Sequence, residues 1–208
     1  MSNASVTAVA CANIAFIKYW GNRPGGLNLP LNPSISMTLS GCVSTTTVTL
    51  GVSGAPDRVE LGGAPAEPAA FSRATRFLDH IRRAAGRAES AQVASSNSFP
   101  TGCGIASSAS GFAALAAAAA GAYRLEADTR ELSRLARLGS GSAARSLYGG
   151  FVELRPGSRH EESFAEPIAP ESAWPDLRDV VLILSEAEKK VSSAEGHRFA
   201  ETSEMFAG

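Results

Sequence analysis

The sequence predicts an α+β fold, and three observations support this class. Segments rich in β-branched residues both precede and follow segments with helical spacing of apolar residues. The two kinds of segment do not alternate regularly, which argues against a doubly wound parallel sheet. With 44% hydrophobic residues, 19% charged residues and 20 glycines in 208 positions, the composition is that of an ordinary globular chain. Fibrous and disordered classes are therefore excluded.

The first element is a strand-rich region from Val6 to Leu50 that surrounds one long loop. Thr45 to Leu50 alternates in polarity as a half-buried strand does, and turn-forming residues gather at Asn22 to Pro33. The next element is a helix over Pro68 to Ala85, where apolar residues recur at helical spacing. Gly86 stands where a helix-ending glycine is expected.

A short strand is predicted over Gln92 to Ser95. A loop rich in glycine and serine follows, and after it a run of small residues with almost no β-branching extends to Tyr123. Small side chains allow close approach of neighbouring elements, so this run predicts a buried helix. We expect the helix to start near Gly104 or Ile105.

A further helix is predicted to begin at Asp128, because Glu131 three residues later resembles a capping box. An apolar stripe continues from there to Gly139, where the helix should end. Two later segments are predicted as strands, Gly149 to Leu154 and Val180 to Leu184. The second is a continuous apolar run, which is typical of a fully buried strand.

Charge and cysteine content exclude several classes of protein. The net charge is -1 and the pI is near 6.3, so no field of one sign would attract nucleic acid or an anionic membrane. Cys11, Cys42 and Cys103 are an odd number at spacings that match no zinc or redox motif, which favours a reducing, cytoplasmic setting. We expect neither a signal peptide nor a membrane span, since the apolar stretch Phe112 to Tyr123 is too short to cross a bilayer.

The first motif with chemical meaning is Pro100-Thr101-Gly102-Cys103-Gly104-Ile105-Ala106-Ser107-Ser108. Glycines let a backbone approach its ligand, and a helix start offers unpaired N-H groups, so the pattern suits a phosphate chain. The hydroxyls of Ser107 and Ser108 could bind phosphate or Mg2+. The motif is neither a Walker loop nor a dinucleotide fingerprint. A tight turn before a core helix is the alternative.

The second motif is Lys18-Tyr19-Trp20-Gly21. If the strand continues through it, alternation sends Lys18 and Trp20 to one face and Tyr19 to the other, next to the loop at Asn22 to Pro33. This predicts a cation flanked by aromatic rings beside a loop. The alternative is a strand with a solvated lysine and two packing aromatic residues.

The third motif is Gly139-Ser140-Gly141-Ser142-Ala143-Ala144-Arg145-Ser146. Serines and glycines around one arginine supply what a bidentate clamp for a carboxylate or phosphate needs. A flexible loop with a surface arginine remains the alternative.

The order and separations of the three motifs resemble the diphosphomevalonate decarboxylase family of the GHMP kinase superfamily. The resemblance covers nearly the whole chain. It rests on segments 13–21, 27–36, 99–111 and 139–150, and it continues through Trp174-Pro175 and Lys189 to Ser193.

The resemblance implies a GHMP-kinase fold. Residues 1–185 would form an amino-terminal ATP-binding domain similar to domain 2 of ribosomal protein S5, and residues 186–208 would begin a carboxy-terminal domain that is mostly missing. It also implies ATP, Mg2+ and a homodimer without nucleic-acid or membrane partners. The 3-hydroxyl of a 5-(di)phosphorylated mevalonate would be phosphorylated, and loss of that phosphate with CO2 would give isopentenyl (di)phosphate.

The resemblance also implies roles for residues. Those that would bind ATP are Ser96, Asn97, Pro100, Thr101, Gly102, Cys103, Gly104, Ile105, Ala106, Ser107 and Ser108, with Ser108 near Mg2+. Those that would bind substrate are Asn13, Tyr19, Trp20, Asn22, Ser140, Ser142, Arg145 and Ser193. Those that would act in catalysis are Lys18, Ser108, Arg145 and Lys189. In these sets Arg145 holds the carboxylate with help from Asn13, and Lys189 reaches toward the γ-phosphate beside Ser192 or Ser193.

The chain departs from the family in two places. It lacks a late Asp-Ala-Gly-Pro-Asn-like segment with the catalytic aspartate, so we expect the 208 residues alone to lack decarboxylase activity. The chain would then be a fragment, or its other half would come from a second polypeptide. Asn22 stands where the family usually has a lysine that contacts the terminal phosphates. The alternatives are therefore a decarboxylase of the monophosphate, a mevalonate 3-kinase-like enzyme and an inactive nucleotide-binding fragment.

Overall fold

The computed structural model describes residues 4–100, 107–182, 196, 199 and 202–204 of the protein. The strands are β1 (Ser5–Ile17), β2 (Ser34–Ser53), β3 (Arg58–Leu61), β4 (Ala64–Pro65), β5 (Glu89–Asn97), β6 (Phe151–Leu154) and β7 (Ala165–Ala169). The α-helices are α1 (Pro68–Ala85), α2 (Ser107–Ala122) and α3 (Thr129–Gly139), and the 3-10 helices are η1 (Gly141–Leu147), η2 (His160–Glu162) and η3 (Glu171–Ala173).

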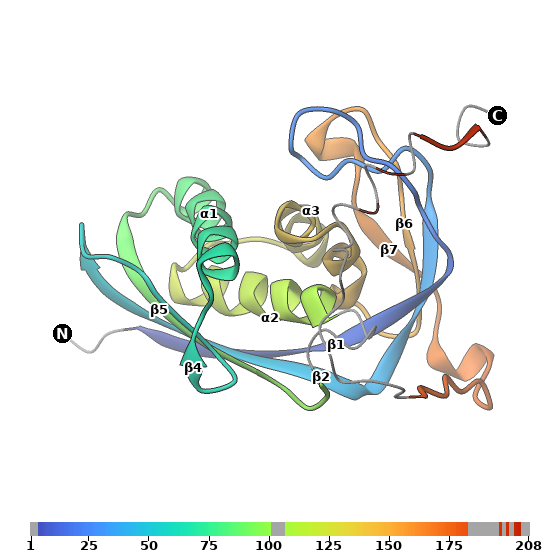
Figure 1. Ribbon diagram of the computed structural model, residues 1–208, viewed down its shortest axis with the longest axis horizontal. Helices are drawn as coiled ribbons and strands as arrows, with labels where there is room; N and C mark the ends of the chain where they lie inside the picture. Colours follow the sequence, from blue (N-terminus) through green and yellow to red (C-terminus); the bar gives the residue numbers. More distant parts are fainter. Residues whose placement is uncertain (1–3, 101–106, 183–195, 197–198, 200–201, 205–208) are drawn as a thin grey trace.

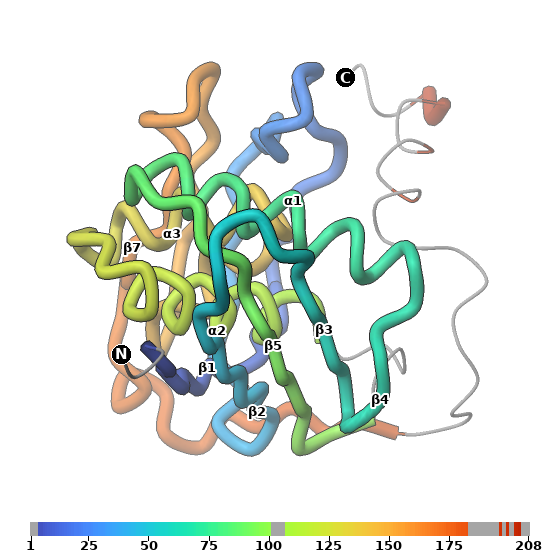
Figure 2. The backbone as a smooth tube through the Cα atoms, turned by 90° about the vertical axis from the view of Figure 1, so that its left-hand side faces the viewer, coloured from blue at the N-terminus to red at the C-terminus, as the bar shows by residue number. Residues whose placement is uncertain are grey.

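The strands form one mixed sheet around the long strand β2. Its order is β4-β3-β5-β2-β6-β7, and β1 pairs with β2 outside this path. Figure 2 shows β4, β3, β5, β2 and β1 side by side. β5 pairs with the second half of β2 and β6 with its start, and the β3–β5 pair is parallel while the other pairs are antiparallel. The mixed sheet confirms the predicted α+β class.

The three α-helices lie on one side of β1 and β2 (Figure 1). The side chains of β2 that face them alternate along the strand, as the period of two requires, and Thr46, Val48 and Leu50 are buried. α2 lies against this face, and its small residues permit the close approach: a Cβ on Gly121 would lie 3.0 Å from Cγ1 of Val6. The core is therefore built between the sheet and α2.

Two predicted helix ends are confirmed by their caps. Gly86 ends α1 in the left-handed conformation, with φ of 63°, which a glycine adopts without strain. At the start of α3 the side chain of Asp128 accepts a hydrogen bond from the backbone N-H of Glu131. The start of α2 predicted near Gly104 or Ile105 lies outside the described residues.

The predicted buried strand at Val180 to Leu184 is wrong for its described part. Val180, Val181 and Leu182 belong to no strand and are 79%, 42% and 79% exposed. An apolar segment forms a buried strand only if it can pair with the edge of a sheet. None of the strands that the structure describes pairs with residues 180–182. Ile183 and Leu184 lie outside the described residues.

Within the described residues, no helix combines the length and the apolar character that a membrane crossing needs.

Candidate active site

Arg145 is the central charged group of the site. It lies on η1 and is only 3% exposed. Its Nε donates to Oγ of Ser36 at 2.9 Å, its Nη1 donates to Oγ of Ser34, and its Nη2 donates to Oδ1 of Asn13 at 3.2 Å. The guanidinium is thus held by three neutral acceptors from β1 and β2.

The local sequence explains this arrangement. Ser34 and Ser36 are two residues apart on β2, so both side chains point to the same face, and both are fully buried. Asn13 on β1 is oriented from its other end, because its Nδ2 donates to the carbonyl oxygen of Ser142 at 3.0 Å and to Oγ of Ser146 at 2.8 Å. The amide oxygen therefore faces Arg145.

The charge of Arg145 has no protein counter-ion in the described part of the chain, where no carboxylate lies within ion-pair distance. Burial lowers the pKa of Arg145 to about 10, and the nearby Tyr19 opposes this shift. Burial also raises the pKa of Tyr19, against the opposing charges of Arg145 and Arg137. Arg145 stays cationic at neutral pH, so the site favours an anion.

A row of hydroxyl groups connects α2 to η1. Oγ of Ser108, in the first turn of α2, lies 3.2 Å from Oγ of Ser140, which lies 3.2 Å from Oγ of Ser142. Tyr19 packs against the same segment: a Cβ on Gly141 would lie 1.8 Å from its hydroxyl oxygen. Glycine at this position therefore makes the approach of Tyr19 possible.

The end of β5 is fixed to the start of α2 by a second row of polar side chains. Oγ of Ser44 donates to Oδ1 of Asn97 at 2.5 Å and lies 2.7 Å from Oγ of Ser110. The two strands and the helix are thereby held together at the point where the chain enters the glycine-rich loop.

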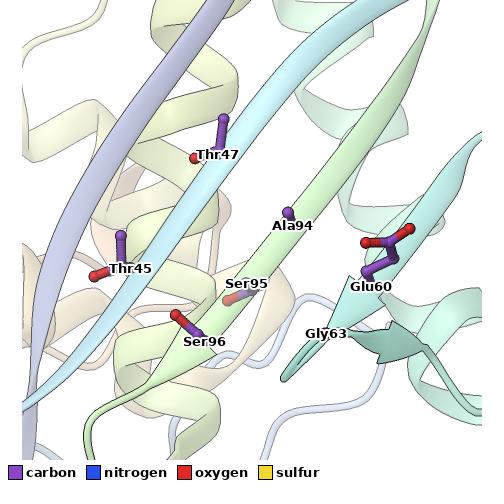
Figure 3. Close-up of a pocket in the computed structure, with 7 residues that line it drawn as sticks. All are labelled: Thr45, Thr47, Glu60, Gly63, Ala94, Ser95 and Ser96. Atoms are coloured by element: carbon purple, nitrogen blue, oxygen red, sulfur yellow. The ribbon is translucent and has the colours of Figure 1, made fainter.

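A shallow pocket of about 210 Å³ lies on the face of the sheet opposite to α2 (Figure 3). It is lined by Thr45, Thr47, Glu60, Gly63, Ala94, Ser95 and Ser96, from β2, β5 and the β3–β4 hairpin. Asn97 is turned instead toward Ser44 on the α2 side of the sheet. Ser96 and Asn97, the two neighbouring residues of β5 predicted to bind ATP, thus point to opposite faces of the sheet.

Residues 10–165 match the diphosphomevalonate decarboxylase-like N-terminal domain family. The chain belongs to the diphosphomevalonate decarboxylase family. This confirms the resemblance found in the sequence motifs.

Individual relatives agree with this membership. The diphosphomevalonate decarboxylase of Aspergillus fumigatus is 42% identical over an alignment of 219 positions, which covers 97% of this chain and 54% of that protein. The structure of the Staphylococcus aureus mevalonate diphosphate decarboxylase is similar with a TM-score of 0.89 and 37% identity, over 99% of this chain and 62% of the other. A complex of MDDEF with MVAPP, AMPPCP and magnesium has a TM-score of 0.88 and 40% identity, over 100% of this chain and 64% of the other.

The likeness to these structures confirms the GHMP-kinase fold. The chain spans about half the length of the curated relatives that it matches.

The first strand, β1, was predicted to continue through Lys18 to Trp20, but in this member of the diphosphomevalonate decarboxylase family it ends at Ile17. The chain then enters a loop, where the backbone N-H of Trp20 donates to Oδ1 of Asn32 at 3.3 Å. Lys18 is exposed and its Nζ donates to the carbonyl oxygen of Ala15 at 3.1 Å, while Trp20 is 52% exposed. Of these three residues Tyr19 is the one that turns inward, and it packs against the buried cluster that includes Ala144.

Asn22 lies in the same loop, in an isolated bridge with Pro30. Its Oδ1 is buried and accepts no hydrogen bond, one of two such buried side-chain atoms in the described residues. A buried acceptor without a donor is costly and therefore rare, so this atom could receive a donor from a ligand.

Several predicted site residues lie outside the described residues, namely 101–106, Lys189, Ser192 and Ser193. Sequence reasoning also missed partners that the structure supplies. Ser34, Ser36 and Ser146 contact Arg145 or Asn13. The Ser-x-Ser spacing at 34 and 36 is the signal that could have found two of them, because it places two hydroxyls on one face of a strand.

Proposed function

We propose that this chain supplies the nucleotide-binding and much of the substrate-binding part of an ATP- and Mg2+-dependent decarboxylase. Its substrate is a 5-phosphorylated or 5-diphosphorylated mevalonate. The 3-hydroxyl is phosphorylated, and loss of that phosphate with CO2 gives isopentenyl phosphate or diphosphate. The observation that carries the proposal is Arg145, a buried cation held by neutral acceptors in a member of this family.

Arg145 binds the substrate carboxylate. A guanidinium has five N-H groups, and Arg145 directs three of them to Ser34, Ser36 and Asn13. Within the described residues the other two have no acceptor, so a planar anion could take both. Because the protein acceptors are neutral, they orient the cation without cancelling its charge. The carboxylate is fixed by one rigid group and can still leave as CO2, since only interactions kept in the transition state lower the barrier.

The phosphates of ATP bind at the start of α2, and the nucleoside lies at the end of β5. Support comes from the family resemblance, which assigns Ser96 and Asn97 at that end of β5 to the nucleotide, and from Ser107 and Ser108 in the first turn of α2. The helix start provides N-H donors and a favourable dipole for phosphate oxygens. A relative forms a complex with AMPPCP and magnesium.

The donors of this site fit Mg2+ as a partner of nucleotide phosphates. Among the described residues no group of three or more His, Cys, Asp or Glu side chains could hold a metal ion alone. Mg2+ commonly keeps waters and binds phosphates with few protein ligands, and the hydroxyl of Ser108 suits that role. Bound there, Mg2+ would supply positive charge to the phosphoryl group in transfer. Ser108, Ser140 and Ser142 would orient the reacting hydroxyl, while Lys18 would reach the phosphorylated tail.

The buried oxygen of Asn22 favours the monophosphate as a second candidate substrate. An amide oxygen accepts and cannot neutralise a second ionised phosphate, as the lysine usual in the family would. We expect the ratio of kcat/KM for monophosphate to that for diphosphate to fall when Asn22→Lys is introduced. A diphosphate preference above about tenfold that Asn22→Lys leaves unaltered would restore the diphosphate as substrate. The homodimer and the cytoplasmic setting stay predictions.

The deciding experiment follows ATP consumption and CO2 release together, for the full product of the reading frame and for the 208-residue chain. The proposal expects equal amounts of ADP and CO2 from the former. ADP without CO2 would indicate a 3-kinase, and neither product a nucleotide-binding protein without turnover. Decarboxylation by the 208 residues alone would contradict the expected need for an aspartate outside them.

A further inference from the structure

Arg137 on α3 is the largest fully buried side chain of the described residues, with 0% exposure. Like Arg145, it has no carboxylate within ion-pair distance in the described part of the chain. Burial lowers its pKa to about 10. Burying an unpaired charge costs several kcal/mol or more, and an apolar residue of similar volume often replaces buried ions without loss of stability. The charge therefore calls for a reason other than stability.

The guanidinium of Arg137 joins two separate segments to α3. Its Nη1 donates to the carbonyl oxygen of Leu27, in the loop formed by residues 18–33. Its Nε donates to the carbonyl oxygen of Ser163 at 3.1 Å. Its Nη2 lies 3.2 Å from the carbonyl oxygen of His160 and 3.0 Å from Nδ1 of the same residue. One side chain thus fixes the loop 18–33 and the connection between β6 and β7.

The loop in turn donates hydrogen bonds to α3. Asn28, with φ of 50°, donates from Nδ2 to the carbonyl oxygens of Arg137 at 2.9 Å and Leu138 at 3.1 Å. These carbonyls belong to the last turn of α3, where backbone acceptors lack helical partners. Arg137 and Asn28 therefore form a reciprocal clasp between the loop and the helix end.

The clasp joins the two segments that carry the site residues. The loop 18–33 carries Tyr19 and Asn22, whereas α3 leads directly into η1 with Arg145. The charges of Arg137 and Arg145 both act on Tyr19.

We propose that Arg137 is a positioning residue for substrate: it holds the loop 18–33 against α3, so that the loop's substrate groups face Arg145. This rests on the proposed function only for the identity of the substrate. A lysine cannot replace it, because one ammonium group cannot reach acceptors from three directions in the plane of a guanidinium. Arg73 offers a matched control: it donates from Nε and Nη2 to the carbonyl oxygen of Gly139 at 3.0 and 2.8 Å, so it contacts the same helix end without touching the loop.

The first test is hydrogen exchange of the 208-residue chain, which requires no activity. The amides of Arg23 and Leu31 close the loop by bonding the carbonyl oxygens of Leu29 and Gly21. We expect Arg137→Met to raise exchange at these amides about tenfold or more while α1 and α2 keep their protection, and Arg73→Met to leave the loop unchanged. Unchanged loop exchange in Arg137→Met would overturn the proposal, as would an equal rise throughout the chain.

The second variant, Asn28→Gly, guards against misfolding of Arg137→Met, because glycine accepts the left-handed backbone while the side chain with its amide is removed. It should raise loop exchange as well, and a loop as protected as in the unmodified chain would overturn the clasp.

The third test measures steady-state kinetics of the full product of the reading frame. Arg137→Met and Arg137→Lys should both raise KM for the phosphorylated mevalonate about tenfold, with KM for ATP and kcat within about threefold. Equal increases in both KM values, or full rescue by lysine, would contradict a positioning role. If the unmodified enzyme releases no CO2, the proposed function fails, and the exchange experiment still decides the clasp.

Discussion

Two buried or nearly buried arginines of this chain have opposite surroundings. Arg82 at the end of α1 donates to Asp57 and, at 2.8 Å, to Asp79, and these hydrogen bonds raise its pKa above the ordinary value against the opposing effect of burial. Arg145 has only neutral acceptors, and burial lowers its pKa to about 10. The charge of Arg82 is neutralised by two carboxylates of the protein itself. The charge of Arg145 is not neutralised and remains available to a ligand.

The contrast follows from where each arginine lies. Asp57 also accepts from the backbone N-H of Ala91 at 2.8 Å, so the Arg82 cluster ties α1 to the turn before β3 and to β5. This cluster connects elements of the fold and contains none of the predicted site residues. Arg145 is bonded to Asn13, which in turn donates to the backbone of Ser142, a member of the hydroxyl row that leads to Ser108 at the start of α2. Stability and ligand binding should therefore respond separately to changes in the two clusters.

The largest effect on stability is expected from Asp57→Ala. Removing it leaves Arg82 without its less exposed partner and frees an amide of β5, which should lower the free energy of unfolding by about 3 kcal/mol. Chemical denaturation of the 208-residue chain measures this. Asp79→Ala is the control, because that carboxylate is 52% exposed and should contribute less than about 1 kcal/mol. Equal losses in both variants would contradict the distinction.

Much of this architecture could be predicted from sequence because local rules decide it. α1 ends at a glycine, and α3 begins at an aspartate whose side chain caps it. The alanine-rich run packs as α2 because its small residues allow the sheet to come close. Asn13 and Arg145 were predicted to lie together from the family resemblance, and they are in contact. Their binding of a carboxylate stays a prediction.

The rest depends on partners that sequence patterns do not reveal. Arg137 stands in an amphipathic helix, where a charged residue is normally expected on the solvent face, yet acceptors from two distant segments surround it. The apolar run at Val180 indicates a buried strand only if a neighbouring strand exists. Asn22 was interpreted as a lost lysine, and its buried, unpaired oxygen emerges only from the packing of the loop.

A smaller effect is expected from Gly141→Ala. The new Cβ would lie 1.8 Å from the hydroxyl oxygen of Tyr19, so the ring must leave its position. We expect a loss of about 1–3 kcal/mol in unfolding free energy and weaker substrate binding. Gly149→Ala is the matched control, because its Cβ would meet no heavy atom within 4 Å. Normal stability and substrate KM in Gly141→Ala would show that Tyr19 does not depend on this glycine.

The smallest effect concerns pH. Burial first, and then the charges of Arg137 and Arg134, lower the pKa of His160 below its ordinary value of 6.5, against the opposing charges of Glu131 and Glu161. The unfolded chain therefore binds the proton more readily, so the contribution of His160 to stability is complete above pH 6.5 and declines as the pH falls toward its lowered pKa. His160→Gln keeps an acceptor for Arg137 and should remove this part of the pH dependence. An unchanged pH profile of unfolding would contradict the assignment.

The central claim is that Arg145 keeps its charge for the substrate carboxylate, and Arg145→Met tests it most directly. The full product of the reading frame should lose more than about tenfold in kcat/KM, equivalent to at least about 1.4 kcal/mol of transition-state binding. The same change in the 208-residue chain should lower unfolding free energy by less than about 2 kcal/mol, because removing an unpaired buried charge offsets the loss of the donor to Asn13. A loss of kcat/KM below tenfold, or a loss of stability as large as that of Asp57→Ala, would contradict the account.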